Sequence, residues 1–200
     1  LVNNAGVSVV GPLEFVPLDE LRRQLEINVT GQVAVTQAAL PLLRARRGRV
    51  VNMGSIAGRS SVPYFGPYTA SKYALEALTD ALRVELRSWQ MQVAVVEPGA
   101  IRTPIWEKSL QAAEGTFAGL PPEAIALYGR SIERMKRVTM RLGAQGIEAE
   151  TVAEAVQHAL GSRRPKARYV VGADAIQRLW LQRLPWRLRD LIFARVLGAG

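Results

Sequence analysis

The sequence reads Arg-Val-Val-Asn-Met-Gly-Ser at residues 49–55 and Tyr-Thr-Ala-Ser-Lys at residues 68–72. The first stretch is a short apolar run that ends in a turn, as expected for a strand buried on both faces of a parallel sheet. The second opens a segment of helical periodicity, and further apolar runs follow at residues 93–96 and 169–171. This alternation of apolar strands and helices predicts an α/β fold built on a parallel sheet.

Tyr68, Lys72 and Ser55 together have the chemistry of a proton-transfer site. Tyr68 and Lys72 are four residues apart, so a helix places them on one face, about one turn from each other. A tyrosine titrates near ~10, and a neighbouring ammonium group would lower that pKa. The Ser55 hydroxyl could donate to the same substrate oxygen that Tyr68 protonates. Taken singly, each residue is also an ordinary structural one, and only the combination favours catalysis.

Four short motifs resemble those of the short-chain dehydrogenase/reductase family. They are, in order, Asn3-Asn4-Ala5-Gly6, Ile27-Asn28-Val29, Ser55 with Tyr68 and Lys72, and Pro98-Gly99 with Thr103. The resemblance covers nearly all of the chain and implies a doubly wound, Rossmann-like parallel sheet. It also implies an NAD(P)-dependent oxidoreductase that interconverts a secondary alcohol and a ketone. The branch that it most resembles acts on lipophilic alcohols such as steroids and retinol.

The resemblance assigns catalytic roles to four residues. Tyr68 would be the general acid or base at the carbinol oxygen, and Ser55 would orient that oxygen. Lys72 would lower the pKa of Tyr68 and hold the ribose of the nicotinamide. Asn28 would interrupt its helix and position a water molecule that links Lys72 to solvent.

The same resemblance assigns cofactor contacts, besides those of Tyr68 and Lys72. Asn3, Ala5 and Gly6 would line the central cofactor cleft. Pro98-Gly99 would let the chain turn beneath the nicotinamide ring, because glycine tolerates a close approach of the backbone. Thr103, with the backbone of Ile101, would hold the carboxamide. The hydride chemistry belongs to the cofactor, and the protein supplies position and electrostatics.

The family begins with features that are not found in residues 1–200. These are a strand, a glycine-rich turn and a helix that receives the pyrophosphate, followed by a second strand whose end reads the adenosine ribose. Leu1 instead begins what resembles the fourth strand. We therefore expect an incomplete fold that lacks the N-terminal β-α-β units, and an isolated chain that is inactive. The cofactor is expected to be NAD or NADP, with the choice left open.

Residues 1–200 are expected to form one incomplete dinucleotide-binding domain, which would be a homo-oligomer when complete. A long helix is expected from about Leu18 to Arg46. Residues 102–140 form the least regular segment, and the resemblance implies a mobile lid over a small lipophilic alcohol or ketone. Apolar side chains would line the pocket, with packing of the lid on the core as the alternative for each: Trp106, Phe117, Leu120, Ile125 and Leu127, and Tyr64 and Phe65 across the cleft.

The chain carries 26 basic and 17 acidic residues, and the excess lies near the C-terminus, where nine basic and two acidic residues follow residue 162. Residues 174–200 are expected to form two basic amphipathic helices around Pro185, rich in tryptophan and leucine. Packing as a C-terminal or dimer-forming helix is favoured, and contact with an anionic membrane surface is the alternative. No recognition motif accompanies the charge, so nucleic acid is not an expected partner.

The chain has no cysteine and one histidine, His158. Disulfides are therefore impossible, and no protein metal site is expected, because the nitrogen and sulfur ligands are almost absent. No apolar run reaches the ~18 residues of a membrane-spanning helix. A cytoplasmic location is expected, with membrane association through the C-terminal segment left open.

Two further readings remain open. An epimerase or dehydratase on the same fold would use the same tyrosine and lysine for a transient oxidation, although the single compact lid argues against this. A non-catalytic truncated chain, or a membrane-surface or subunit-interaction module, is the non-enzymatic alternative. The intact set of Asn28, Ser55, Tyr68 and Lys72 favours the enzyme.

Overall fold

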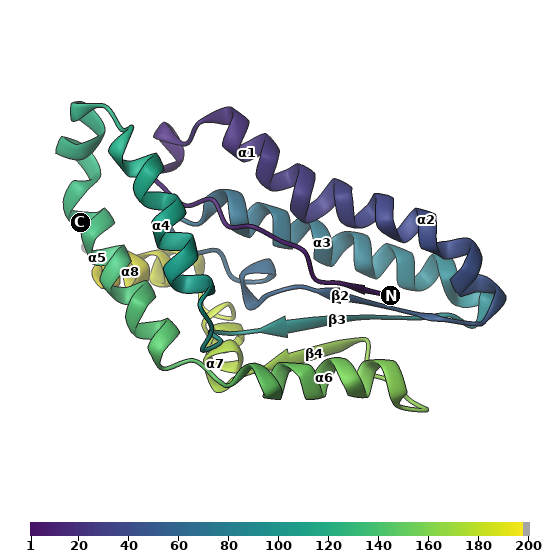
Figure 1. The fold of residues 1–200 in the computed structure, drawn as a ribbon. Helices are drawn as coiled ribbons and strands as arrows, with labels where there is room; N and C mark the ends of the chain where they lie inside the picture. Colours follow the sequence, from purple (N-terminus) through teal and green to yellow (C-terminus); the bar gives the residue numbers. More distant parts are fainter. Residues whose placement is uncertain (198–200) are drawn as a thin grey trace.

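The computed structural model describes residues 1–197 and confirms the Rossmann-like parallel α/β fold. Four strands pair in parallel in the order β1-β2-β3-β4 (Figure 1), with Val51 opposite Ala94 and Val96 opposite Tyr169. Because all four run in one direction, their carboxyl ends meet at one edge of the sheet. The strands are β1 (Val2–Asn3), β2 (Arg49–Met53), β3 (Gln92–Pro98) and β4 (Arg168–Val171).

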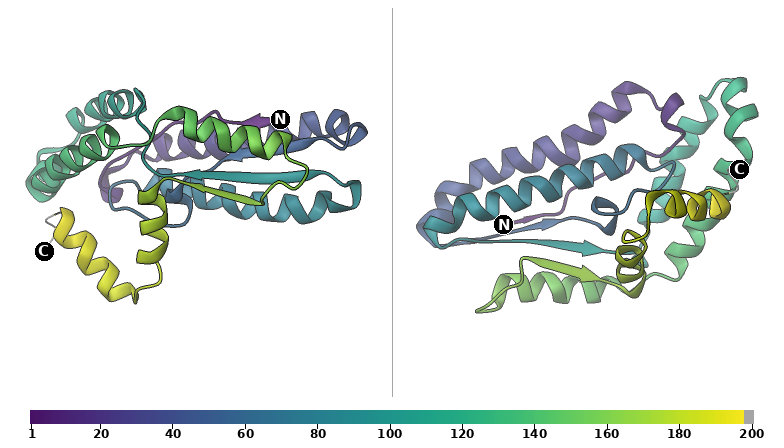
Figure 2. Two further views of the ribbon diagram at one scale, coloured as in Figure 1. Left: turned by 90° about the horizontal axis from the view of Figure 1, so that it is seen from below. Right: turned by 180° about the vertical axis from the view of Figure 1, so that it is seen from behind.

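Helices cover both faces of this sheet. Helices α1, α2 and α3 lie on one face and α6 lies on the other (Figures 1 and 2), as expected for a doubly wound sheet. Helices α4 and α5 stand beyond the carboxyl ends of the strands, and α7 and α8 follow β4. The helices are α1 (Leu18–Leu25), α2 (Gly31–Ala45), α3 (Gly66–Glu85), α4 (Ile105–Ala118), α5 (Pro122–Ala144), α6 (Ala149–Gly161), α7 (Ala173–Leu181) and α8 (Trp186–Leu197).

Residues 50–51 of β2 and 93–96 of β3 are apolar, because both faces of these strands are buried. Val51 and Val96 pack against α6 in a cluster that includes Val152. Val50 and Val93 point to the opposite face and pack with Leu86, which follows α3. Successive side chains of a strand alternate between faces, so a run without polar residues is what a two-sided sheet requires.

The helix expected from Leu18 to Arg46 is divided in the structure. A π-helical turn, η2 (Glu26–Thr30), separates α1 from α2. Asn28 in this turn is fully buried, and its amide bonds both the N–H and the carbonyl of Val7 at 2.9 Å. The π-helical turn thus lies at the asparagine that bonds the loop after β1. Hydrophobic periodicity carries no signal for this polar contact, so it predicted one continuous helix.

Residues 102–140, expected to be irregular, instead form α4 and most of α5. Trp106 stabilises the start of α4, because its indole N–H donates to the carbonyl of Ile101 at 2.6 Å. A Cβ on Gly143 would lie 2.6 Å from the Trp106 ring, so glycine lets α5 approach this indole. Long-range packing of this kind stabilises helices whose sequence pattern is weak.

The C-terminal segment forms α7 and α8 on the two sides of Pro185, the position at which the sequence predicted a break. Leu197, at the end of α8, is buried in a cluster with Met135 of α5 and Phe117 of α4. Helix α8 therefore packs beside α5, while α7 packs at the end of β4 (Figure 2). Residues 198–200 of the predicted 174–200 segment lie outside the described residues.

A buried charge cluster joins β3, α3 and β4. The Arg168 guanidinium donates to Glu97 at 2.6 Å and to Asp80 at 2.5 Å, and it also bonds Glu76. Glu97 is fully buried and Glu76 nearly so. Burial, and next repulsion from Glu97, raise the pKa of Glu76 to about 7, although Arg168 opposes the shift. Arg168 thus bonds three carboxylates, with Arg59 also on Glu97 at 3.4 Å and Arg83 also on Asp80 at 2.7 Å. Glu76 bonds only Arg168 among these cations and shifts toward its neutral form.

This shift predicts a pH-dependent stability. Between the unfolded pKa of ~4.3 and the folded value of about 7, the folded state binds more protons, so the free energy of unfolding falls as the pH rises. Glu76→Gln should remove this dependence, which amounts to at most ~1.4 kcal/mol per pH unit. Urea unfolding followed by circular dichroism from pH 5 to pH 7 measures it.

The matched control is Glu85→Gln, which changes an exposed carboxylate of the same helix. It should keep the wild-type dependence on pH. Equal slopes for the wild type and Glu76→Gln would contradict the assignment.

Candidate active site

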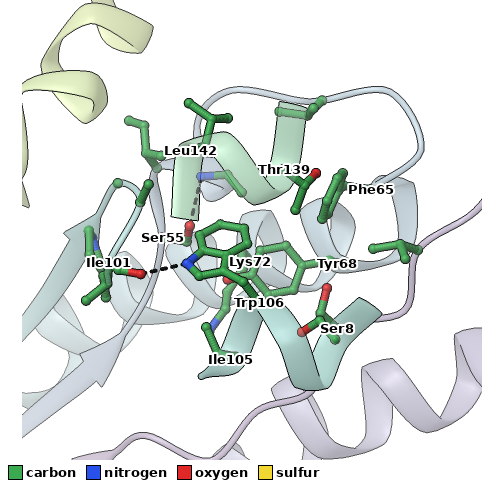
Figure 3. Close-up of a pocket in the computed structure, with 18 of the residues that line it drawn as sticks. Ser8, Ser55, Phe65, Tyr68, Lys72, Ile101, Ile105, Trp106, Thr139 and Leu142 are labelled. Atoms are coloured by element: carbon green, nitrogen blue, oxygen red, sulfur yellow. Dashed lines mark hydrogen bonds between the residues drawn. The ribbon is translucent and has the colours of Figure 1, made fainter. Parts of the chain in front are cut away.

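A cavity of about 430 Å³ opens at the carboxyl ends of β1, β2 and β3. Ser55, Tyr68 and Lys72 line it together, and Trp106 of α4 and Leu142 of α5 close it from the other side (Figure 3). The carboxyl edge of an open parallel sheet is the usual place for a ligand in this architecture. The three residues of the predicted proton-transfer set therefore share one cavity.

Ser55 is placed by the turn that follows β2. It caps the short helix η3 (Ile56–Gly58), and its hydroxyl accepts the N–H of Ala57 at 3.1 Å. A Cβ on Gly58 would lie 2.9 Å from the carbonyl oxygen of Lys72, so this glycine lets η3 pack directly on α3. The position of Ser55 relative to α3 is thereby fixed by backbone packing.

Tyr68 lies in the first turns of α3, which begins at Gly66 with Pro67 in its first turn. Burial raises the pKa of Tyr68, while a hydrogen bond with Ser55 and the charge of Arg178 lower it by smaller amounts. The sequence predicted a lowered pKa produced by Lys72. The prediction is wrong for the structure as it stands, because desolvation of the phenolate outweighs the nearby charges.

Lys72 is directed at the backbone rather than at the phenol oxygen. Its ammonium donates to the carbonyl of Met53 at 2.7 Å and lies 5.7 Å from the centre of the Tyr68 ring. Only 5% of the residue is exposed, and burial lowers the pKa of Lys72 to about 8 despite the favourable charge of Glu76. The cavity therefore holds an ammonium group that is costly to keep charged.

Asn28 does not line the cavity, but it connects two elements that do. Its amide donates to the Ser71 hydroxyl at 3.1 Å, and Ser71 lies between Tyr68 and Lys72 on α3. The other Asn28 contacts hold Val7, which lines the cavity. Asn28 thus connects the loop after β1 to α3.

The predicted cofactor contacts divide into two groups. Gly6, Pro98, Gly99 and Ile101 line the cavity with Tyr68 and Lys72. Asn3, Ala5 and Thr103 do not. The Asn3 amide donates to Asn52 and to Thr36 at 2.8 Å, and the carbonyl of Ala5 accepts from Gln32 at 2.9 Å.

Two of the seven predicted pocket residues, Phe65 and Trp106, line the cavity. Phe117, Leu120 and Tyr64 instead pack in the neighbouring apolar cluster around Val10 and Met135. Ile125 and Leu127 are 49% and 61% exposed and turn away from the cavity. Which side chains of α5 are packed and which are exposed depends on the helix face that meets the core. The irregular sequence pattern of residues 102–140 did not predict that face.

Arg178 of α7 also lines the cavity and was not expected there. Arg178 is one of nine basic residues after residue 162, eight of which are arginines, so the sequence does not single it out. Its distance in sequence from Tyr68 gives no local signal, and the position follows from the way α7 packs after β4. Asp174 lies four residues earlier on the same helix, but its carboxylate accepts the N–H of Ala100 at 2.8 Å.

Comparison with known proteins gives a consistent result. A family model described as short chain dehydrogenase matches residues 1–114. The chain is 37% identical to an NADPH-dependent 3-dehydrocapnine reductase of Ornithobacterium rhinotracheale, over 98% of this chain and 69% of that protein. It is 40% identical to retinol dehydrogenase 5 of Mus musculus, over 98% of this chain and 64% of that protein.

Solved structures agree with the sequence matches. A short-chain dehydrogenase from Streptomyces avermitilis superposes with a TM-score of 0.71 at 30% identity, covering 100% of this chain and 69% of that one. A short chain dehydrogenase from Burkholderia cenocepacia J2315 in complex with NADP superposes with a TM-score of 0.69 at 24% identity, over 98% of this chain and 68% of that one, which supports the fold. The chain thus spans 64–69% of the length of these four proteins.

The burial of Lys72 predicts a second pH effect, of opposite sign to that of Glu76. Between about 8 and the unfolded pKa of ~10.4, the folded state binds fewer protons, so the wild type gains stability as the pH rises. Lys72→Met lacks this gain. The unfolding free energy of the wild type minus that of Lys72→Met should therefore rise by about 1 kcal/mol per pH unit. Urea unfolding at pH 8, 9 and 10 measures it.

Lys166→Met removes an exposed lysine and is the matched control, expected to follow the wild type at every pH. A constant difference between the wild type and Lys72→Met across this range would show that Lys72 is not a buried, depressed ammonium.

Proposed function

Because the chain belongs to the short-chain dehydrogenase/reductase family, whose members use NAD or NADP, we propose that it interconverts a secondary alcohol and a ketone by hydride transfer. The observation that carries this proposal is the convergence of Ser55, Tyr68 and Lys72 on one cavity at the carboxyl edge of the sheet. The chain spans about two thirds of its relatives, so the activity is proposed for the protein that contains these residues.

Tyr68 is the proposed acid and base. In the reductive direction its phenol donates a proton to the carbonyl oxygen as the carbon receives hydride, and in the oxidative direction the phenolate removes it. Ser55 donates a hydrogen bond to the same oxygen and stabilises the charge that develops there. Burial makes the Tyr68 phenol a weaker acid, and the hydrogen bond with Ser55 and the charge of Arg178 act against that shift in its pKa.

Lys72 and Asn28 are proposed to support this transfer. Lys72 would hold the nicotinamide ribose through its ammonium group. Asn28 would position a water molecule that returns protons to Lys72 from solvent. The bond from Asn28 to Ser71 supports a structural contribution as well, because it fixes the helix that carries Tyr68 and Lys72.

The cavity fits the nicotinamide end of the cofactor, which supplies the hydride when bound. Lys72 offers a buried cationic donor, and Gly6, Pro98 and Gly99 give an edge with little side-chain bulk. We propose that these residues hold the nicotinamide and its ribose, with the backbone of Ile101. We also propose Ala5 and Thr103 as cofactor contacts. Asn3 is proposed to act on the cofactor site indirectly, through its buried hydrogen bond to Asn52 of β2.

The proposed substrate is a small lipophilic alcohol or ketone. Ile105, Trp106, Met135, Leu142 and Phe193 are among the side chains that wall the cavity opposite Tyr68. Burial of an apolar substrate against such walls contributes about 25 cal/mol per Å².

Tyr68→Phe should lower kcat by about a hundredfold or more, because it removes the acid while leaving the ring in place. Turnover is followed as the change in NADH or NADPH absorbance with a lipophilic ketone and with the corresponding alcohol. Cofactor affinity, measured by calorimetry, should stay within a few-fold of the wild type.

Tyr73→Phe is the matched control, since Tyr73 is an exposed tyrosine on the same helix. Substantial activity in Tyr68→Phe would overturn the role of Tyr68. Product formation from an epimerisable substrate, without net change of the cofactor, would favour the epimerase reading instead.

A second proposal concerns the surface of α7 and α8. Trp180 and Trp186 are 61% and 62% exposed, and the guanidinium groups of Arg183 and Arg187 lie over their rings. Tryptophan beside arginine suits the interface of an anionic bilayer. No helix within residues 1–197 has the length and apolar character needed to cross a membrane. We therefore propose peripheral contact through this surface.

Replacing both Trp180 and Trp186 by Ala should reduce sedimentation with vesicles of phosphatidylcholine and phosphatidylserine by about tenfold, because the apolar contact is lost. Trp89→Ala is the control, since Trp89 is also exposed and stacked on an arginine, Arg44, far from this surface. Equal sedimentation of the wild type and the double variant would remove the proposal.

A further inference from the structure

We propose that Arg178 forms an anion subsite in the cavity, so that the substrate is an amphiphile with an apolar body and an acidic group close to its reacting carbon. This inference rests on the proposed function, and it narrows the substrate from a lipophilic ketone to an anionic one. It is carried by the position of Arg178 and by the charges and apolar walls around it.

The charged groups that line the cavity are both cations. Among the lining residues within 1–197, Lys72 and Arg178 carry full charges and no carboxylate is present. Lys72 already donates to the carbonyl of Met53 at 2.7 Å. Because Lys72 is also the donor proposed for the nicotinamide ribose, the guanidinium of Arg178 is the cation left for a substrate, and the cavity as a whole favours an anion.

Arg178 lacks a protein partner in the described part of the chain. No carboxylate of residues 1–197 lies within 4.0 Å of its guanidinium. Asp174, one turn earlier, is occupied by the N–H of Ala100, which donates to it at 2.8 Å. Asp174 is near enough to act on Arg178 through its charge, but burial still lowers the pKa of Arg178. A partly buried guanidinium with unused donors is costly unless a ligand accepts from it.

Arg178 and Tyr68 line the same cavity. Arg178 is close enough to Tyr68 for its charge to favour the phenolate. A group bound by Arg178 thus lies near the oxygen that Tyr68 would protonate. We therefore place the acid group of the substrate close to its carbonyl, and planar carboxylates match the guanidinium fork in particular.

The remaining walls specify the rest of the ligand. Side chains from α4, α5 and α8 face this space, among them Ile105, Val138, Leu142 and Phe193. These walls suit an alkyl or fused-ring body, which they would remove from water. The same α7–α8 pair therefore contributes both the cation and part of the apolar wall.

The test compares two ligands of one length, decanoate and decanamide, by calorimetry on the purified protein with saturating NADP⁺ or NAD⁺. The wild type should bind decanoate at least about tenfold more tightly, as expected for a charge-assisted hydrogen bond. Arg178→Gln should bring the two affinities together, and Arg178→Lys should retain part of the preference. Arg183→Gln, an exposed arginine just after α7, should behave as the wild type.

A wild type that binds decanamide as tightly as decanoate would overturn the subsite without any variant. An unchanged preference for decanoate in Arg178→Gln would also overturn the subsite, and would leave Arg178 with only its effect on the pKa of Tyr68. Retained binding of decanamide shows that the variant is folded.

Calorimetry does not depend on turnover, so the two proposals can fail separately. Arg178-dependent binding of decanoate in a protein without Tyr68-dependent turnover would support the anion subsite and contradict the oxidoreductase. Tyr68-dependent turnover without a preference for decanoate would contradict the subsite alone.

Discussion

Parallel pairing of β2 with β3 is the constraint on which the site depends. Parallel neighbours need a crossover, and here the crossover is α3, so one connection carries Ser55, Tyr68 and Lys72 across a single face of the sheet. The shared direction of the strands brings Ser55 after β2 and Gly99 after β3 to the same edge. Chemistry at that edge is therefore a property of topology first and of side chains second.

The buried face of α3 carries ionisable side chains whose burial costs free energy. Lys72 and Glu76 lie on successive turns, both buried, and both are displaced toward their neutral forms. Gly58 brings η3 against the backbone between them, which excludes water from the same region. A core built for stability alone would place apolar residues here. The buried ammonium of Lys72 is what the proposed function requires, and its burial is offset by packing elsewhere.

Much of the fold and of the site was predictable because the signals are local. The apolar strand at 49–53, the four-residue spacing of Tyr68 and Lys72, and the break at Pro185 each depend on neighbours in sequence. The order of α4 and α5 was missed because it depends on Trp106 meeting Gly143, which are 37 residues apart. Arg178 was missed for the same reason, and the pKa of Tyr68 because burial is a property of the whole assembly rather than of a spacing.

The origin of the cavity walls has a consequence for how such a protein changes over time. Every residue proposed to move a proton lies before residue 73, whereas α4, α5, α7 and α8 supply the opposite wall from residues after 104. Substitutions in the later part can reshape what enters the cavity without touching the acid, its serine or its lysine. The residues proposed for the reaction and those proposed to select the reactant thus lie in separate stretches of the chain, which can change at different rates. Arg178 belongs to both roles, because its charge also lowers the pKa of Tyr68.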